Sequence, residues 1–391
     1  MSKIFTSIGL MSGTSMDGVD AALLKTDGEG HIQNPARTAF RPYGAKEQAA
    51  IAAAIEDMAE AFNLFEKDGS FDRLGPAGFS SHQLSKLRHG LKQAQEIVLQ
   101  AHEQVVRDLL DRDAIEPEKI DLIGFHGQTV LHRPEKGITV QLGYGELLAD
   151  RLGIPVVGDF RSADLEAGGQ GAPLVPLYHQ ALVKQAGLEL PVAVLNVGGV
   201  ANVTYIGANE ELIAFDTGPG NALIDDWVGQ HGAGKMDKGG EIAAQGKVKE
   251  SVLAKLLSDP YFSQDPPKSL DRNHFSLAPL AGMSLAWGAM TLTSFTALAV
   301  ARADFFFPAP PKKWIICGGG VRNPVLMGEF QKRLSGEVMA AGELGWSSDY
   351  MEAEAFAYLA VRSLKGLPLT LPGTTGVAKP VTGGVLHKPQ G

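Results

Sequence analysis

The sequence predicts an α/β protein made of two similar halves. Apolar runs of strand length alternate with glycine-rich turns and helical stretches along the chain. The opening pattern of strand, glycine turn and strand returns after Pro191, which indicates an internal duplication. The 391 residues also exceed what one hydrophobic core usually organises. We therefore expect two domains, residues 1–190 and 191–391, that face one another across a cleft lined by glycine turns, with the C-terminal helix able to pack back on the first domain.

The first half begins with a predicted β-hairpin and two predicted helices. Ile4–Leu10 and Val19–Lys25 are apolar runs joined by the turn GTSMDG, a pattern typical of a hairpin. Ala45–Phe65 and Leu91–Leu110 predict helices, and apolar residues recur every four positions in the second, which favours packing on a sheet. Between them, Lys67–Gly90 is rich in Gly, Ser and Phe and predicts a surface excursion.

Polar residues follow two further predicted strands. Asp121–Phe125 is a short apolar strand that ends in HGQT, and Ile154–Val157 is a strand that ends in GDFR. Gly145–Leu152, between them, predicts a helix. Open α/β sheets bind ligands at the carboxyl ends of their strands, so we expect functional side chains at both places.

The second half repeats this arrangement. VAVLNVGGVANVTYI predicts strand, turn and strand, FDTGPGNALIDDW a loop into a helix, and WIICGGGVRNPVLM a strand, three glycines and a helix start. Ala353–Lys365 predicts the last helix. The stretch from Asn273 to Ala301 has no charged residue, but its many Ala, Ser, Thr and Gly residues favour a buried central helix over a membrane span.

Composition and charge narrow the functional classes. The net charge is −9 and no basic run is present, which argues against nucleic acid or an anionic membrane as a partner. The single cysteine, Cys317, excludes an internal disulfide and a cysteine metal cluster. The first ten residues lack a signal pattern, so we expect a cytoplasmic protein.

The densest polar turn, GTSMDGVD at residues 13–20, predicts a phosphate site. Its glycines free backbone N–H groups to point at phosphate oxygens, and Thr14 and Ser15 add hydroxyl donors. Asp17 can hold a magnesium ion directly or through water. An ordinary hairpin turn is the alternative, but a second copy at Asn196–Asn202 favours the phosphate site.

The GDFR and HGQT segments supply candidate acid–base and substrate residues. Asp159 is the natural general base, since a carboxylate at a strand end can reach a bound water. Arg161 could instead form a structural pair with Asp159, and the sequence leaves both interpretations open. His126 and His132 are six residues apart, which fits no common metal-ligand pair. We expect HGQT to hydrogen-bond a substrate, and a buried structural histidine is the alternative.

Seven motifs, in order, are similar to those of one enzyme family. GLMSGTSMDGVDAALL, GFHGQTVLHRP, GDFRSADLEAGGQGAPLVP, NVGGVANVTYI, FDTGPGNALIDDW, CGGGVRNPVLM and EAEAFAYLAVRSL span nearly the whole chain and resemble anhydro-N-acetylmuramic acid kinase. The resemblance implies two duplicated actin-like (ribonuclease H-like) ATPase domains with ATP in the interdomain cleft. It also implies a reaction of peptidoglycan recycling, in which water opens the 1,6-anhydro bridge while the 6-oxygen takes a phosphoryl group from ATP.

The resemblance also implies roles for individual residues. Asp159 would be the catalytic base that activates the water. His126, Gln128, Arg161 and Glu352 would contact the sugar. The cofactors would be ATP and Mg²⁺, with Asp17 at the metal. The residues implied to bind ATP are Gly13, Thr14, Ser15, Met16, Asp17, Gly18, Val19 and Asp20 in the first turn, Asn196, Gly198 and Gly199 in the second, Asp216, Gly218, Gly220 and Asn221 in a loop near the phosphates, and Gly318, Gly319, Gly320 and Asn323 near the adenosine.

Two other functions remain compatible with the sequence. A different sugar or carboxylic-acid kinase would keep every phosphate turn and change HGQT and GDFR, and a non-catalytic ATP-driven clamp would need no base. One segment departs from the pattern of the family, because LDRN follows from Leu270 where TGRE is common. We expect a small-molecule sugar and ATP as partners, and a homodimer.

Overall fold

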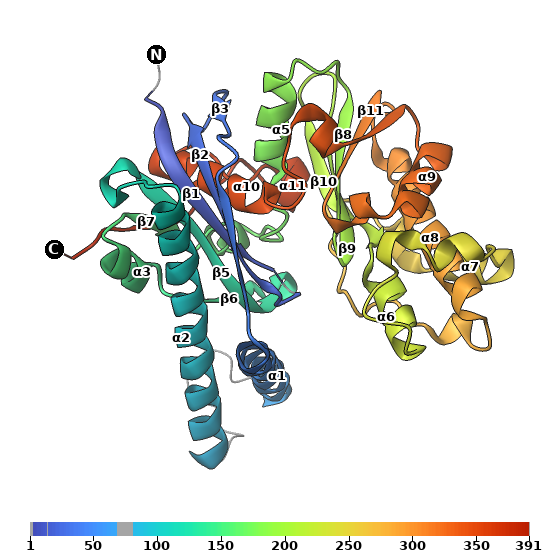
Figure 1. Ribbon diagram of the computed structural model, residues 1–391, viewed down its shortest axis with the longest axis horizontal. Helices are drawn as coiled ribbons and strands as arrows, with labels where there is room; N and C mark the ends of the chain where they lie inside the picture. The colour runs from blue at the N-terminus through green and yellow to red at the C-terminus, as the bar shows by residue number, and fades with distance from the viewer. Residues whose placement is uncertain (1–2, 14, 69–80, 391) are drawn as a thin grey trace. The chain divides into compact units, whose positions relative to one another are not determined.

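The computed structural model describes residues 3–13, 15–68 and 81–390, and contacts divide the chain into two compact units (Figure 1). Unit 1 comprises Met1–Gly171, Glu352–Thr370 and Pro380–Gly391, and unit 2 comprises Ala172–Met351 and Leu371–Lys379. The division after Gly171 differs from the expected boundary at residue 190. Helix α5 (Pro176–Gln185) precedes residue 190 but belongs to unit 2, because it contacts strands β9 (Val200–Ile206) and β10 (Leu212–Pro219) of the unit 2 sheet.

Over the described residues, unit 1 is built on a mixed eight-stranded sheet with the order β13-β7-β5-β1-β2-β3, in which β4 pairs with β2 and β6 pairs with β5. β1 is antiparallel to β2 and parallel to β5, and β5 is parallel to β7. The strands are β1 Phe5–Ser12, β2 Gly18–Thr26, β3 Ile32–Gln33, β4 Thr38–Pro42, β5 Leu122–Arg133, β6 Ile138–Leu142, β7 Val156–Gly158 and β13 Val385–His387.

Helices cover both faces of this sheet. They are α1 Ala45–Asp68, α2 Ser81–Arg112, α3 Gly145–Leu152, α4 Ser162–Glu166 and α10 Met351–Leu364. Ile8 and Leu10 of β1 are buried in one core with side chains of α1 and α2. Figure 1 shows α2 as a long rod beside the sheet. Burial of these apolar side chains is the main stabilising contribution on this face.

Two adjacent glycines bring α10 onto the other face. Side chains alternate along a strand, so Gly9 points away from the face that Ile8 and Leu10 share. A Cβ on Gly9 would lie 1.8 Å from the carbonyl oxygen of Ala353, and a Cβ on its register partner Gly124 would lie 2.1 Å from that of Phe356. The backbone of α10 therefore packs directly on β1 and β5, which positions the first turn of the helix.

Several predicted elements end at other residues in the structure. The strand expected at Asp121–Phe125 continues through HGQT to Arg133, because its second half pairs with β6. Gly127 has a φ of 73° within this strand. The flanks of the Lys67–Gly90 excursion are helical, since α1 ends at Asp68 and α2 begins at Ser81, and its residues 69–80 lie outside the described residues.

The described part of unit 2 contains a five-stranded sheet with the order β10-β9-β8-β11-β12. β8 is antiparallel to β9 and parallel to β11. The strands are β8 Val192–Val197, β9 Val200–Ile206, β10 Leu212–Pro219, β11 Lys313–Cys317 and β12 Glu337–Ala340. The helices are α5 Pro176–Gln185, α6 Ala222–Gln230, α7 Glu250–Leu257, α8 Leu285–Ala301, α9 Pro324–Arg333 and α11 Pro372–Thr375.

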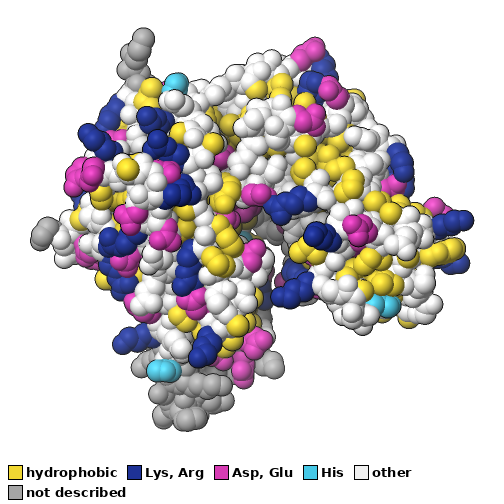
Figure 2. All heavy atoms as spheres, in the orientation of Figure 1, with side chains coloured by type: hydrophobic (Ala, Val, Ile, Leu, Met, Phe, Trp, Pro, Cys, Tyr) yellow, Lys and Arg dark blue, Asp and Glu magenta, His cyan; other side chains and the backbone are white. Residues whose placement is uncertain are grey.

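Within the uncharged stretch from Asn273 to Ala301, residues Leu285–Ala301 form the buried helix α8. Phe295 and Val300 of α8 are fully buried, and α8 contacts α6, α7 and α9. No helix among the described residues is long and apolar enough to span a membrane. On the face of the molecule in Figure 2, basic and acidic side chains are interspersed.

Candidate active site

The first glycine turn joins β1 to β2 in unit 1 and exposes a hydroxyl and a carboxylate. Ser15 and Asp17 are both exposed, and the Ser15 hydroxyl donates to Asp17 Oδ1 at 2.8 Å. The Met16 amide donates to the Gly13 carbonyl at 3.2 Å. Met16 has a φ of 53°, a left-handed conformation that is uncommon for a residue with a Cβ and is frequent at functional sites. Thr14 lies outside the described residues.

A series of hydrogen bonds between buried polar side chains holds this turn in place. Tyr43 is bonded to the Ser12 hydroxyl at 3.1 Å, and the Ser12 hydroxyl donates to Gln128 Oε1 at 2.6 Å. Gln128 Nε2 then donates to the carbonyl of Gly13 at 3.2 Å. Burial raises the pKa of Tyr43 to about 12, so its hydroxyl keeps its proton at neutral pH. The amide of Gln128, which the sequence predicts to contact the sugar, is thus bonded to the turn, and its role at the sugar stays a prediction.

The remaining residues of the first motif support the turn from β2. A Cβ on Gly18 would lie 2.4 Å from the Arg41 carbonyl oxygen, so only glycine fits between β2 and β4. The side chain of Val19 is fully buried in the core, which leaves its backbone for any nucleotide contact. Asp20 is half-buried and is the register partner of Met11.

Asp159 follows β7 directly and presents an exposed carboxylate. It has a φ of 51°, and Oδ1 accepts from the Ser162 hydroxyl at 2.6 Å and from the Ser162 amide at 3.3 Å. Within the described residues no donor is bonded to Oδ2. The guanidinium of Arg161 is bonded elsewhere, so the structure does not show the Asp159–Arg161 pair that the sequence left open. Asp159 can therefore accept a proton at Oδ2 while Ser162 orients the group.

Arg161 and His126 form a buried pair whose tautomer follows from its hydrogen bonds. His126 Nδ1 lies 2.8 Å from the Gly127 carbonyl, which can only accept, so Nδ1 carries the proton. His126 Nε2 then accepts from Arg161 Nη2 at 2.8 Å and from Arg161 Nε at 3.1 Å. Burial and the Arg161 charge lower the pKa of His126 well below its usual value. His126 is therefore a neutral acceptor at neutral pH.

Glu352 joins this pair from the start of α10. Its close approach depends on the packing of α10 against Gly9 and Gly124. Burial raises the pKa of Glu352, and the Arg161 charge opposes that shift. Burial lowers the pKa of Arg161 to about 10, which still leaves the guanidinium charged at neutral pH. The structure thus brings three of the predicted sugar residues, from β5, the β7–α4 loop and α10, into one electrostatic cluster.

The second glycine turn, in unit 2, is held by backbone groups. The Asn221 amide donates to the Gly198 carbonyl at 2.8 Å, and the Gly220 amide donates to the Gly199 carbonyl at 2.9 Å. A Cβ on Gly220 would lie 2.2 Å from the Gly198 carbonyl oxygen. Asn221 Nδ2 also donates to the carbonyls of Val197 and Gly198 at 3.2 Å. Hydrogen bonds therefore join the predicted residues Gly198 and Gly199 of the second turn to Gly220 and Asn221 of the 216–221 loop.

The glycines after β11 approach the same turn. Cys317 is the register partner of Asn196, which places Gly318 beside the end of β8. Gly318 has a φ of 77°, and a Cβ there would lie 2.3 Å from Asn196 Oδ1. A Cβ on Gly320 would lie 2.5 Å from Val197 Cγ1. Only glycine allows this close packing, so the third loop is positioned by the second turn.

Asn323 and Gly218 have structural partners in unit 2. Asn323 Oδ1 accepts from the amides of Val325 and Leu326 at 3.1 Å and so caps α9. The predicted contact of Asn323 with adenosine would therefore use its side-chain Nδ2. Gly218 lies at a register shift of β10, where a Cβ would be 2.7 Å from the Cβ of Ala299. Both assignments to ATP stay predictions.

Asp216 is the carboxyl group of this region with the largest shift toward the neutral form. Its Oδ2 accepts from the Leu270 amide at 2.8 Å, and its own amide donates to the Lys268 carbonyl at 3.0 Å. Burial raises the pKa of Asp216 to about 7, and the Leu270 hydrogen bond opposes the shift. A nearby cation would favour the ionised form of Asp216.

Comparisons with known proteins show the family of this chain. The family model described as anhydro-N-acetylmuramic acid kinase matches residues 5–70 and 79–389. This chain belongs to that family. The anhydro-N-acetylmuramic acid kinase of Methylobacterium nodulans is 48% identical over 98% of this chain and 100% of its own length. That of Rhizorhabdus wittichii is 49% identical over 98% of this chain and 99% of its own length.

Sequence reasoning missed three residues that the structure places at these kinase motifs. Ser12 and Tyr43 hold the first turn, and Arg272 lies beside the second. Ser12 directly precedes the GTSMDG turn, which was a usable signal. Tyr43 follows β4 and reaches Ser12 by tertiary packing, so no local pattern marks it.

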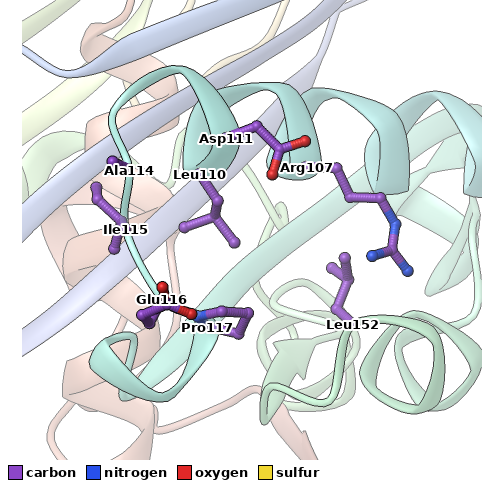
Figure 3. Close-up of a pocket in the computed structure, with 8 residues that line it drawn as sticks. All are labelled: Arg107, Leu110, Asp111, Ala114, Ile115, Glu116, Pro117 and Leu152. Atoms are coloured by element: carbon purple, nitrogen blue, oxygen red, sulfur yellow. The ribbon is translucent and has the colours of Figure 1, made fainter.

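A separate pocket lies at the C-terminal end of α2 and contains none of the predicted site residues (Figure 3). Its lining residues are Arg107, Leu110, Asp111, Ala114, Ile115, Glu116, Pro117 and Leu152. The Arg107 guanidinium already donates to the Arg151 carbonyl at 2.7 Å. We assign no part of the kinase site to this pocket.

Proposed function

We propose that this chain is an ATP-dependent kinase that converts 1,6-anhydro-N-acetylmuramic acid and water to N-acetylmuramic acid 6-phosphate, with release of ADP, in peptidoglycan recycling and amino-sugar catabolism. Its membership of the family supports the substrate. One observation carries the chemistry, namely the exposed Asp159 carboxylate at the end of β7 with Oδ1 held by Ser162.

Asp159 is the proposed general base. As the oxygen of a water bonds to C1 of the sugar, the bond between C1 and O6 breaks and Asp159 accepts a proton from the water. The electron pair left on O6 forms the new bond to the terminal phosphorus of ATP, and ADP leaves. One water, one sugar and one ATP therefore account for every bond made and broken.

The cluster of His126, Arg161 and Glu352 is proposed to bind the sugar. The neutral imidazole holds the guanidinium on one side through Nε2, and the Gly171 carbonyl accepts from Arg161 Nη1 at 2.6 Å. The guanidinium is thereby fixed near the end of β7. A fixed and buried cation with hydrogen-bonding neighbours can orient a polar substrate without reorganisation when the substrate binds.

ATP and Mg²⁺ are proposed as the nucleotide and the metal. The glycine turns offer backbone amides for phosphate oxygens, and oxygen is the donor that Mg²⁺ prefers. Asp17 in the first turn and Asp216 beside the second supply carboxylate oxygens, so both fit such an ion, with Asp17 acting directly or through water. The metal would neutralise charge on the phosphate chain. Among the described residues, no three or more His, Cys, Asp or Glu side chains are grouped so that they could hold a metal ion.

The two sheets support a duplication. In unit 1 the order β4-β2-β1-β5-β7 has two antiparallel pairs followed by two parallel pairs. The order β10-β9-β8-β11-β12 in unit 2 has the same arrangement. We propose two actin-like domains, with one ATP engaging a glycine turn from each across a cleft. A cytoplasmic homodimer is part of the same proposal, and light scattering of the purified chain tests its mass.

The test is ADP release with the anhydro sugar, together with identification of the 6-phosphate product. Asp159→Asn keeps the volume of the side chain and removes the proton acceptor, so we expect turnover to fall by about 10² to 10⁴ while the fold survives. Glu166→Gln changes an exposed carboxylate on the adjacent helix α4 and should leave the rate near that of the wild type. A folded Asp159→Asn variant with near-normal turnover would refute the assignment.

Two alternatives give different results in the same assay. Another sugar or carboxylic-acid kinase would release ADP with a substrate other than the anhydro sugar. An ATP-driven clamp would turn over ATP without any sugar. The relatives named as anhydro-N-acetylmuramic acid kinases do not favour either alternative.

A further inference from the structure

An arginine that no motif singles out lies against the second glycine turn. Arg272 Nε is 3.9 Å from the position that a Cβ on Gly199 would occupy. Because Gly199 has no side chain, the guanidinium faces the backbone of the turn directly. Arg272 belongs to the LDRN segment, which departs from the TGRE pattern of the family. This segment nevertheless places a positively charged side chain beside the turn.

The backbone that carries Arg272 is firmly anchored. Two residues before it, the Leu270 amide is bonded to the Asp216 carboxylate. Lys268 is buried, and its Nζ donates to the carbonyls of Tyr261 and Gln264 at 3.1 and 2.8 Å. The same ammonium lies 4.3, 4.9 and 5.5 Å from the centres of three aromatic rings. These bonds hold the backbone at residues 268 and 270, directly before Arg272.

The surroundings of the second turn are acidic. Asp216 lies on β10, and Asp225 and Asp226 lie on α6. Burial raises the pKa of Asp225 to about 6, the Asp226 charge adds to the shift, and Arg272 opposes it. A phosphate chain brought to these carboxylates would be repelled unless cations compensate. Arg272 is a basic side chain whose charge acts on Asp225 and which pairs with Asp226.

The present partner of Arg272 is easily exchanged. Its Nη2 lies 3.0 Å from Asp226 Oδ1, and the two side chains are 48% and 42% exposed. An ion pair between such exposed groups contributes little to stability. The phosphate chain of a nucleotide carries more negative charge than one carboxylate, and its oxygens can also accept two parallel hydrogen bonds from a guanidinium.

We infer that Arg272 binds the phosphate chain of ATP at the second glycine turn, leaving Asp226 when the nucleotide arrives. The inference rests on the proposed function, because it takes the turn at Asn196–Gly199 to be a phosphate site. It adds to the backbone amides a side-chain cation that compensates the nearby carboxylates.

Calorimetric titration of the full chain with Mg²⁺ and a non-hydrolysable ATP analogue tests the inference. Arg272→Ala should weaken binding by about 10- to 100-fold, and Arg272→Lys should restore part of the loss. The loss should shrink at high salt because it is electrostatic. Arg112→Ala is the matched control, since Arg112 also pairs with an aspartate, is 53% exposed and lies in unit 1.

Asp226→Asn separates phosphate binding from a structural role of the ion pair. If Arg272 binds phosphate, removal of its competing partner should keep or improve the affinity for the analogue. Equal losses in Asp226→Asn and Arg272→Ala, or an unchanged affinity in Arg272→Ala, would overturn the inference. The outcome is distinct from that of the proposed function, since a wild-type chain that binds the analogue but does not phosphorylate the anhydro sugar would contradict only the latter.

Discussion

The two glycine turns share the layout of strand, turn and strand but are held in different ways. The turn at Gly13–Asp17 rests on a chain of side-chain hydrogen bonds from Tyr43 through Ser12 to Gln128. The turn at Gly198–Gly199 rests on backbone hydrogen bonds to Gly220 and Asn221, to which the Asn221 side-chain amide adds bonds to the Val197 and Gly198 carbonyls. The first turn therefore depends on a chain of polar side chains, and the second depends in addition on the close contact of two backbones at Gly220.

This difference predicts different sensitivities to substitution. Where side chains hold a turn, a substitution removes one or two hydrogen bonds and the backbone can stay in place. Where two backbones touch, one added methyl group displaces a strand or a loop, because no flexible side chain is available to move aside. The predictions below test that contrast.

The largest effect is expected for Gly220→Ala in unit 2. The added Cβ would lie 2.2 Å from the Gly198 carbonyl oxygen, so the second turn and the 216–221 loop must separate. We expect a loss of roughly 3 kcal/mol or more in the free energy of unfolding, and loss of ATP binding. Denaturant unfolding measures the first, and calorimetric titration measures the second.

Gly328→Ala is the control for this change. Gly328 lies inside α9, and a Cβ there would meet no atom within 4 Å. Alanine has the higher helix propensity, so stability should stay the same or rise by about 0.5 to 1 kcal/mol. Equal destabilisation by both changes would remove the basis of the comparison.

A smaller effect is expected for Gln128→Leu in unit 1. This change leaves the buried Ser12 hydroxyl and the Gly13 carbonyl without their amide partner, at a cost of about 1 to 3 kcal/mol. We expect the KM for ATP to rise by roughly tenfold, because the loosened turn presents its amides less well. Steady-state ADP release measures KM for each substrate.

Gln141→Leu, on the neighbouring strand β6, is the matched control for Gln128→Leu. Gln141 bonds to Thr129 and Thr139 and not to the turn. It should therefore leave the KM for ATP near the wild-type value. A rise in the KM for the sugar alone in Gln128→Leu would instead support the direct sugar contact predicted from the sequence.

The smallest effect is expected for Asp216→Asn and depends on pH. Burial raises the pKa of Asp216 from 3.8 to about 7, so the folded state binds this proton more tightly than the unfolded state does. The stability that the proton contributes is complete below pH 3.8 and is lost as the pH rises toward 7. The Tm of Asp216→Asn relative to the wild type should therefore rise between these pH values and level off above.

Differential scanning calorimetry at several pH values measures this trend. Thr217→Val is the control, because it removes a buried hydroxyl on the same strand without removing a titrating group. Its Tm difference should not vary with pH. A difference for Asp216→Asn that is flat across the same range would contradict the raised pKa.

Much of the site followed from local patterns. Hairpins, glycine turns and helices have short-range signals, so β1, β2, β8, β9 and α10 were predicted close to their observed bounds. Asp159 was predicted from its place directly after an apolar run. The path of β5 through HGQT was not, because its extension depends on pairing with β6, which only the folded sheet provides.

The sequence by itself determined the family, the α/β class and the positions of the glycine turns, because these depend on residue type and on spacing along the chain. Tertiary structure alone decided the partners of the polar side chains. Arg161 bonds to His126 and not to Asp159, and Gln128 bonds to the first turn. Arg272 reaches the second turn from a loop more than seventy residues away. Hydrogen-bond partners are chosen by geometry in space, and distance along the chain does not encode that geometry.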